Sequence, residues 1–216
     1  MESFLKKIIS SLILFSVLGF AQAQTSEQVK SDDVLKFRIV QLVSVGQSFS
    51  DGAESSDSAS VKIDQTTGER TYTTAKEGVV LRKNNLFGTL QRNKYLFAAD
   101  EIDNLFRTTA SVGEKWKEVV YFNSNRCGRV KNDYEVSITQ GPDVVVKIKG
   151  VPVALKTIQV AREGMWYAAG RCGGSGTKYL KVLFSPELNE IVHDEYRTYD
   201  RGILSVGEKK ILESIN

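Results

Sequence analysis

The clearest candidates for chemistry in this chain are its single histidine, His193, and its two cysteines, Cys127 and Cys172. A histidine can act as a general base or bind a metal when a nucleophile or further ligands lie near it. His193 stands in the apolar and acidic stretch 191–195, with no serine or cysteine beside it. We therefore interpret His193 as a histidine of a β-strand and not as a catalytic group.

Both cysteines occur in Arg-Cys-Gly contexts within glycine-rich stretches. In an oxidising compartment such a pair forms a disulfide. A Cys127–Cys172 bond would close a loop of about 46 residues and stabilise the fold by roughly 4 kcal/mol. It requires an even number of antiparallel strands between the cysteines, because only then do both lie at the same end of the sheet. We predict this disulfide, and the alternative is a free thiol that serves as the nucleophile of an enzyme.

Three other groups of polar residues lack the spacing of known sites. Residues 173–177 match neither the nucleophile elbow G-x-S-x-G nor a phosphate-binding loop. Asp51, Glu54 and Asp57 lack the spacing of a calcium-binding EF-hand. The carboxylates at 194–195 point to opposite faces of a strand, so they cannot both act on one glycosidic bond. The sequence therefore predicts no catalytic residue, no metal site and no cofactor.

Aromatic side chains are concentrated in the second half of the chain. They are expected either to fill the core of a curved antiparallel sheet or to line a groove for a lipid or a peptide. The candidate groove residues are Trp116, Trp166, Tyr167, Tyr179 and Phe184. Their strand-forming context favours the core, and the groove stays the alternative.

The first 23 residues have the pattern of a secretory signal peptide. Lys6 and Lys7 precede the apolar run 8–20, and the small residues at 21–23 indicate cleavage before Gln24. The run is shorter than the roughly twenty residues that a helix needs to cross a bilayer. We expect a periplasmic or secreted protein with no integral membrane segment after cleavage.

The composition fits one soluble β domain. With 29 Lys and Arg against 26 Asp and Glu, the chain is close to neutral, and its basic residues are scattered between acids. Nucleic acid is therefore excluded as a partner, because phosphate backbones require concentrated positive charge. After cleavage about 190 residues remain, enough for a sizeable core.

Short apolar segments separated by turn residues recur about every eight to twelve residues, the spacing of antiparallel sandwiches and barrels. Residues 24–33 are expected to be flexible, 46–60 to form a long mobile loop and 100–106 to form the one short helix. The sequence thus predicts a mainly all-β fold over 34–216, an antiparallel meander that forms a curved sheet or half-open β-barrel. The predicted strands are 34–45, 61–63, 71–73, 79–81, 87–90, 95–97, 116–123, 133–139, 144–149, 155–160, 165–167, 178–184, 190–197 and 209–215.

The second half also resembles a group of exported bacterial proteins of unknown function. Their strands open with V-G-x-x-W, as at 112–116, and a late segment reads aromatic-S/A-P-E-L-x-x-I-V, as at 184–192. Their V-P-A-G-x-F turn is replaced by V-P-V-A-L at 151–155, which lacks the glycine and the aromatic residue. The resemblance implies a half-open β-barrel akin to lipoprotein-carrier folds, and it brings no catalytic residues.

Together these features favour an exported, non-catalytic β protein that acts by binding or structural interaction at the cell envelope. Its partner would be an unknown envelope protein or an apolar ligand. One alternative is a carrier that holds a lipid or lipoprotein acyl chain in a half-barrel groove. The other is the thiol-dependent enzyme.

Overall fold

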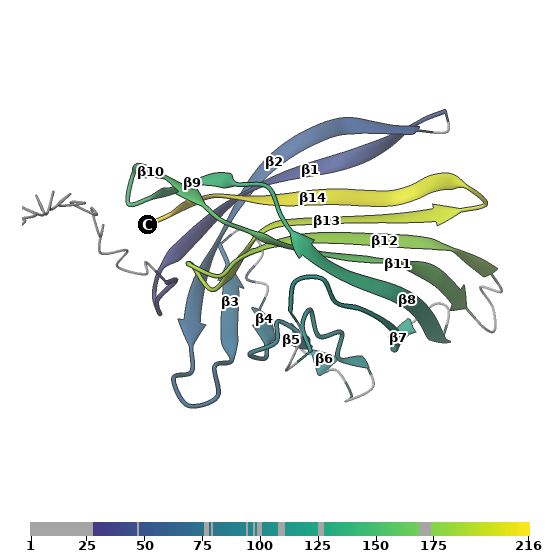
Figure 1. Cartoon of the computed structure of the whole chain (residues 1–216), viewed down its shortest axis with the longest axis horizontal. Coiled ribbons are helices and arrows are strands. Elements are labelled where there is room, and N and C mark those ends of the chain that lie inside the picture. The colour runs from purple at the N-terminus through teal and green to yellow at the C-terminus, as the bar shows by residue number, and fades with distance from the viewer. Residues whose placement is uncertain are drawn as a thin grey trace, which may run out of the picture.

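Fourteen β-strands and no α-helix make up the described part of the chain in the computed structural model (Figure 1). The structure describes residues 28–46, 48–75, 78, 80–93, 95–96, 98, 101–107, 111–124, 128–168 and 174–216. No helix within these ranges has the length and apolar character to cross a membrane. The strands are β1 (Val34–Val45), β2 (Ser48–Ile63), β3 (Arg70–Thr74), β4 (Val80–Lys83), β5 (Thr89–Arg92), β6 (Tyr95–Leu96), β7 (Lys115–Ser124), β8 (Gly128–Gln140), β9 (Val144–Ile148), β10 (Val151–Leu155), β11 (Ile158–Ala168), β12 (Gly174–Ser185), β13 (Glu190–Asp200) and β14 (Ile203–Ile215).

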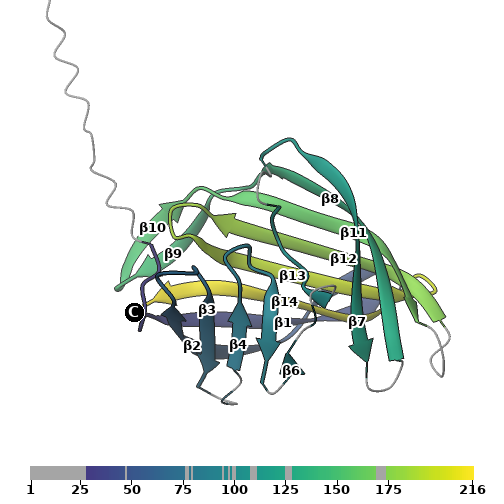
Figure 2. The same cartoon turned by 90° about the horizontal axis from the view of Figure 1, so that it is seen from below.

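Twelve of these strands form one antiparallel path in the order β6-β5-β4-β3-β2-β1-β14-β13-β12-β11-β8-β7. The β9–β10 hairpin joins this path through a short parallel pairing between β9 and the end of β14. The sheet curls around a concave side (Figure 2), and its edge strands β6 and β7 are not hydrogen-bonded to each other. The predicted curved, half-open antiparallel sheet is confirmed.

The concave face of the sheet carries the core. Residues that pair directly across neighbouring strands share a face, and one such row consists of Ile138, Val160 and Val182, all of them buried. This row packs with Phe87 and Leu105 from the chain between β4 and β7, so these residues cover the concave side. A second cluster fills the end at which β12 turns into β13 and includes Leu35, Val61, Val146, Leu188 and Leu212.

The largest departure from the sequence-based prediction is at residues 46–60, which were expected to form a loop. After a turn at Gly46, which has a φ of +61°, β2 runs antiparallel to β1 from the Val45–Ser48 pair to the Val34–Ser60 pair. Most side chains of this ribbon are exposed, so its polar sequence shows no alternation of burial. Its backbone is held by hydrogen bonds to β1, which the polarity of the side chains does not reveal.

Three smaller predictions also differ from the structure. In place of the helix predicted at 100–106, Glu101 has a 3₁₀ conformation and residues 102–107 cross the concave side without helical structure, while residue 100 lies outside the described residues. The segment 28–33 is docked and not free, since the Val29 side chain is buried and its N–H donates to the Leu188 carbonyl at 3.0 Å. The predicted strand 155–160 is divided between β10 and β11.

The signal peptide at 1–23 and the predicted Cys127–Cys172 disulfide lie outside the described residues, so both stay predictions. Val130 of β8 and Ala168 of β11 pair directly, which places the strand ends nearest the two cysteines at the same end of the sheet. Four strands, β8 to β11, separate these ends. The described strands therefore meet the even-number condition for the bond.

Candidate functional site

One half of the concave face is covered by the connection between β4 and β7. Phe87 and Phe106 of this connection pack edge to face on Phe184 of β12, with ring centroids 5.3 and 5.0 Å apart. Edge-to-face pairs at this separation are favourable beyond the area that they bury. This half of the groove is therefore filled by the protein's own side chains.

Arg162 of β11 anchors this covering segment to the sheet. Its guanidinium group is only 1% exposed and donates to the Asp103 carboxylate and the Asn104 carbonyl. It also forms an ion pair with Glu118 of β7 at 3.2 Å. Several acceptors around one buried cation offset its loss of hydration. Because Asp103 belongs to the covering segment and Glu118 to the edge strand, Arg162 ties three parts of the fold together.

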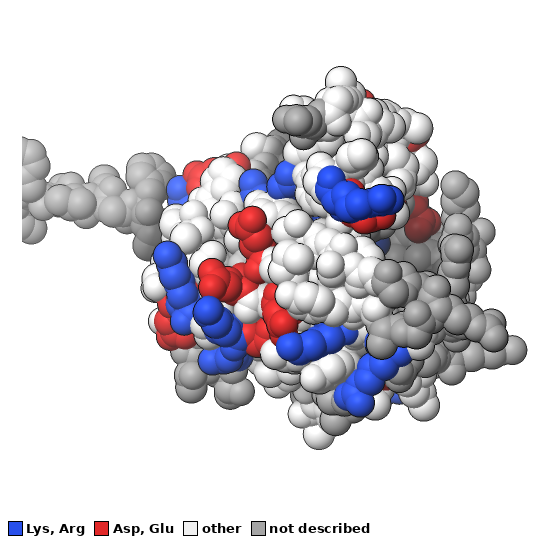
Figure 3. Space-filling view, turned by 90° about the vertical axis from the view of Figure 1, so that its right-hand side faces the viewer, with Lys and Arg blue, Asp and Glu red and all other residues white. Residues whose placement is uncertain are grey.

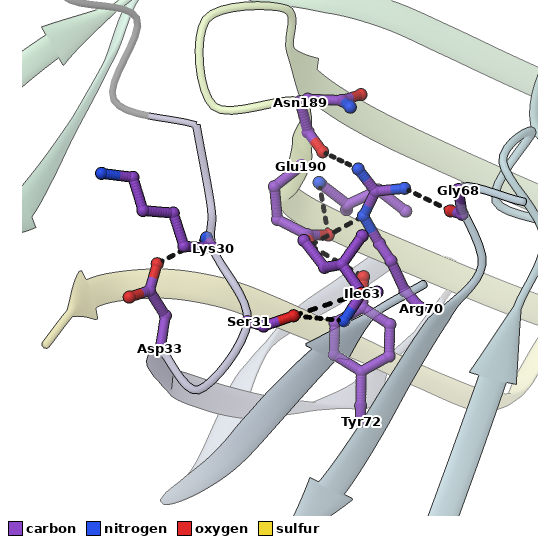
Figure 4. A network of polar contacts seen from close by, with 10 residues as sticks. Lys30, Ser31, Asp33, Ile63, Gly68, Arg70, Tyr72, Asn189 and Glu190 are labelled. Carbon is purple, nitrogen blue, oxygen red and sulfur yellow. Dashed lines mark hydrogen bonds and ion pairs between the residues drawn. The ribbon is translucent and has the colours of Figure 1, made fainter. Parts of the chain in front are cut away.

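A second buried network closes the groove at the end where β12 turns into β13 (Figure 4). The Tyr72 hydroxyl of β3 donates to the Glu190 carboxylate at 2.7 Å, and Arg70 donates to the carbonyls of Gly68 and Asn189 at 3.2 and 3.1 Å. Burial raises the pKa of Glu190, whereas the Tyr72 hydrogen bond lowers it. Burial and the charge of Glu190 raise the pKa of Tyr72 well above its ordinary value. These contacts fasten β3 to the β12–β13 turn.

The other half of the concave face, on β1, β13 and β14, carries charges with fewer partners. Lys210 and Asp194 lie directly opposite each other on β14 and β13, and Lys83 of β4 lies opposite the inward-pointing Arg70. The Lys210 ammonium group sits 4.0 Å from the ring centroid of Phe37. The Oδ1 atom of Asp194 is buried and has no hydrogen-bond partner within the described ranges.

The surroundings of Asp194 and Lys210 shift the pKa values of both side chains. Burial raises the pKa of Asp194, while the positive charges of Lys83 and Lys210 oppose the rise. Burial likewise lowers the pKa of Lys210. Desolvation thus disfavours both charged forms, and any group that bonded to them would relieve that cost.

Further along the strands the concave face opens to solvent. Tyr196 pairs with Glu208, which in turn pairs with Gln41, so the three share this face. Val206 and Val43 follow at the period of two that keeps side chains on one side of a strand. Tyr196, Val206 and Val43 are 38%, 51% and 44% exposed. These apolar side chains form an uncovered surface, which we call the open half of the groove.

Three of the five aromatic residues proposed from the sequence as groove residues face the concave side. Trp116, Trp166 and Phe184 share the face of the buried rows, and Phe184 is covered by two phenylalanine rings. Tyr167 and Tyr179 face the convex side, where a guanidinium group lies 4.0 Å from the Tyr179 ring centroid. Because neighbouring residues of a strand point to opposite faces, the five side chains do not line one groove.

The remaining candidates from the sequence lie apart from the groove. His193 is a half-buried strand residue whose Nε2 lies 3.6 Å from the Glu195 carboxylate. Asp51 forms an ion pair with Lys209 at 2.5 Å. Within the part of the chain that the structure describes, no three His, Cys, Asp or Glu side chains are grouped as metal ligands.

The outer surface is hollowed and mixed in charge. An open hollow of about 650 Å³ spreads over the convex face of β7, β8, β11 and β12 and is lined by Lys117, Glu135, Glu163 and Tyr179, among others. Figure 3 shows lysine, arginine and acidic side chains interspersed on one end of the molecule. A mixed surface of this kind agrees with the near-neutral composition.

Sequence reasoning did not identify the inward-facing charges Arg70, Arg162, Asp194 and Lys210, of which Arg70 and Arg162 are buried. One signal was available for two of them, since Arg162 follows Val160 and Lys210 precedes Leu212 by two residues. A charged residue in phase with buried apolar residues of a strand points into the core. Such a residue is buried only with a partner or at a functional site.

No family model and no curated protein sequence matches the chain. Among solved structures, the chain aligns with the hypothetical lipoprotein YmcC from Escherichia coli (K12), with 10% identity, coverage of 88% of this chain and 87% of that chain, and a TM-score of 0.46. It also aligns with a proposed lipoprotein from Parabacteroides distasonis ATCC 8503, with 12% identity, 88% and 96% coverage, and a TM-score of 0.43. At these scores neither similarity carries a conclusion about function.

Proposed function

We propose that the protein is an exported, non-catalytic binding protein of the bacterial envelope, and that it binds through the open half of its concave face. The signal-peptide pattern of residues 1–23 supports export. The observation that carries the binding surface is the division of the groove. Phe87 and Phe106 fill one half, whereas Tyr196 and Val206 stay exposed in the other. Exposed apolar groups rimmed by polar ones are typical of interaction sites.

A lipid or lipoprotein acyl chain is the alternative ligand, and the charges of the concave face argue against it. Lys210, Asp194 and Glu208 lie on this face in the open half, beside Tyr196. An acyl chain placed there would remove water from each ion without supplying a hydrogen bond, which is costly. The surface instead suits a ligand or peptide that presents polar groups to these ions and apolar groups to Tyr196 and Val206.

Export is tested by fractionating cells that express the full chain and sequencing the N-terminus of the purified protein. Cleavage predicts that the periplasmic protein begins at Gln24. Recovery of uncleaved Met1 protein from the cytosol would refute the export part of the proposal.

The binding surface is tested with a ligand panel of sugars, sugar phosphates, peptides and fatty acids, screened by thermal shift and mapped by NMR. We expect compounds that bind to perturb the amides of Tyr196 and Val206, and Tyr196→Ala to weaken them at least tenfold. Val119→Ala, at a 48% exposed position on the convex face, is the matched control and should change nothing. Ligands that map only to the convex face would refute the proposal.

The lipid alternative has its own readout. Native mass spectrometry of protein purified from the periplasm without detergent should show the mass of the bare chain. A stoichiometric acyl lipid that survives purification would replace the proposal with the carrier function.

A further inference from the structure

A polar hollow of about 430 Å³ lies at the end of the sheet that the Arg70 network closes. Its volume falls within the range of about 300–1,000 Å³ that is usual for small-molecule sites. The lining comes from five parts of the chain, which are the N-terminal segment 28–31, the end of β2 with the β2–β3 turn, the first residue of β3, the β4–β5 turn and the β12–β13 turn. None of its lining residues belongs to the open half of the groove.

The walls of this hollow are held in place by the fold itself. The Ile63 N–H donates to the Ser31 hydroxyl at 2.8 Å, which fixes the N-terminal segment against β2. Arg70, only 4% exposed, donates to the carbonyls of Gly68 and Asn189 and so joins the β2–β3 turn to the β12–β13 turn (Figure 4). A ligand that binds between walls already fixed loses less free energy to ordering them.

Gly68 brings the β4–β5 turn to the hollow as well. Its φ is +71°, a conformation that favours glycine. A Cβ atom at this position would lie 3.1 Å from the Cβ atom of Asn85. Because glycine has no side chain, Asn85 can pack against the β2–β3 turn and complete the lining.

Four amide side chains line the hollow, and none of them makes a hydrogen bond to another described residue. They are those of Gln28, Gln65, Asn85 and Asn189. Each amide carries two N–H donors and one acceptor oxygen. Water satisfies these groups when the hollow holds no ligand. A ligand that displaces the water must therefore offer both donors and acceptors.

The charges around the hollow balance each other. Lys30 and Asp64 have opposite signs, and Nε of Arg70 lies 4.0 Å from the buried Glu190 carboxylate. Two backbone N–H groups of the β2–β3 turn donate to Oδ1 of Asp64 and lower its pKa, so this carboxylate is ionised at neutral pH. A lining with balanced charge favours a neutral ligand over an ion.

We propose that this hollow binds a neutral polyhydroxyl ligand, a mono- or disaccharide. A hydroxyl group both donates and accepts, as an amide does, so neighbouring hydroxyls of a sugar ring would bond to Gln65, Asn85 and Asn189. Oδ2 of Asp64 would accept from a further hydroxyl, and Ile63 would contact the C–H groups of the ring. The inference goes beyond the proposed function, because the site is separate from the open half.

Recognition through hydroxyl groups predicts which analogues bind poorly. A site that hydrogen-bonds a hydroxyl group discriminates against a ligand that lacks it, because the polar groups of the site are then left unpaired. A sugar that binds should therefore do so at least tenfold more tightly than cyclohexanol, a ring of six carbons with one hydroxyl. Trialanine, which offers amide groups in place of hydroxyls, should also bind more weakly than the sugar.

The test is NMR titration of the mature protein at pH 7 with glucose, galactose, N-acetylglucosamine, maltose, cyclohexanol and trialanine. At least one sugar should bind saturably and shift the side-chain amide signals of Asn85 and Asn189. The backbone amides of Tyr196 and Val206 should stay unperturbed by that sugar. Asn85→Leu should weaken its binding at least tenfold. Gln159→Leu, on the convex face of β11, is the matched control and should bind as the native protein does.

Several results would overturn the inference. One is the absence of saturable binding of all four sugars by protein whose circular dichroism shows a folded sheet. Others are equal binding of cyclohexanol, an equal loss in Gln159→Leu, or tighter binding of trialanine, which would assign the hollow to peptides. If Asn85→Leu fails to fold, Gln65→Leu at an exposed turn position serves in its place. Sugars that map to Tyr196 would support the open half as the binding surface and remove this inference alone.

Discussion

Replacement of Arg162 by alanine tests how the covering segment is held. The substitution removes a guanidinium group that is 1% exposed and leaves Asp103 and Glu118 facing each other without their shared cation. The same change removes the donor to the Asn104 carbonyl. The covering segment would then keep its apolar contacts with Phe184, the Arg107 hydrogen bond to the Lys117 carbonyl and its backbone bonds.

The size of the stability loss in Arg162→Ala follows from the burial of the Arg162 ion pairs. Loss of one partner of a buried ion pair costs about 3–5 kcal/mol, because the remaining charge is left uncompensated. For a domain of this length each kcal/mol lowers the Tm by about 2–4 °C. Arg162→Ala should therefore lower the Tm by about 6–20 °C.

Differential scanning calorimetry measures this shift, with Arg38→Ala as the matched control. Arg38 also pairs with two acids, Glu54 and Glu213 at 3.2 Å each, but its side chain is 42% exposed. Exposed pairs contribute about 0–1 kcal/mol each, so the loss of two should lower its Tm by no more than about 8 °C. Equal shifts in the two variants would refute the reasoning from burial.

A second readout localises the Arg162 effect. Amide hydrogen exchange should accelerate over residues 101–107 in Arg162→Ala and stay unchanged in β1 and β14. A variant that combines Arg162→Met with Asp103→Asn and Glu118→Gln should regain most of the lost stability, since an uncharged set of similar volume removes the unpaired ions.

Three further predictions concern other parts of the fold. The pKa of Asp194 is raised in the folded state, so the native protein should lose stability relative to Asp194→Asn as pH rises from about 4 through that raised pKa. Urea unfolding measures this difference. The native protein and Asp194→Asn should have similar stability only at the acid end of the range. Tyr72→Phe removes the 2.7 Å hydrogen bond to buried Glu190 and should cost about 1–3 kcal/mol in urea unfolding; an unchanged midpoint would contradict the role of this network. Titration with a thiol reagent under denaturing, non-reducing conditions should find no free thiol at Cys127 or Cys172, and two free thiols would exclude the disulfide.

Much of the fold could be predicted from the sequence because the residue patterns that mark strands and turns lie within short stretches of the chain. Alternation of apolar and polar residues located most strands and their phase, including Trp116 and Glu118 on one face of β7. Turn residues such as Gly68, with a φ of +71°, located the β2–β3 hairpin. The outer part of β2 was missed because its strand conformation depends on pairing with β1 and not on burial.

The candidate site could not be predicted in the same way, because its contacts join distant parts of the chain. Arg162 meets Asp103 from 59 residues away, and Tyr72 meets Glu190 from 118 residues away. The strand period shows that these side chains point inward, but the partner depends on how the sheet curls. The same period would have separated Trp166 from Tyr167, had it been applied to the candidate groove residues.

The charges inside the groove also bear on why its shape persists. An interior that was apolar throughout could close on itself, because apolar side chains pack in many arrangements at similar energy. Arg162 and Arg70 instead hold the covering segment and β3 at fixed positions through directional bonds. With both ends of the inner face fastened, Asp194 and Lys210 lie between them, and Oδ1 of Asp194 has no hydrogen-bond partner in the described part of the chain. The open half is thus the part of the groove whose polar groups a ligand can satisfy without displacing a bond that the fold already makes.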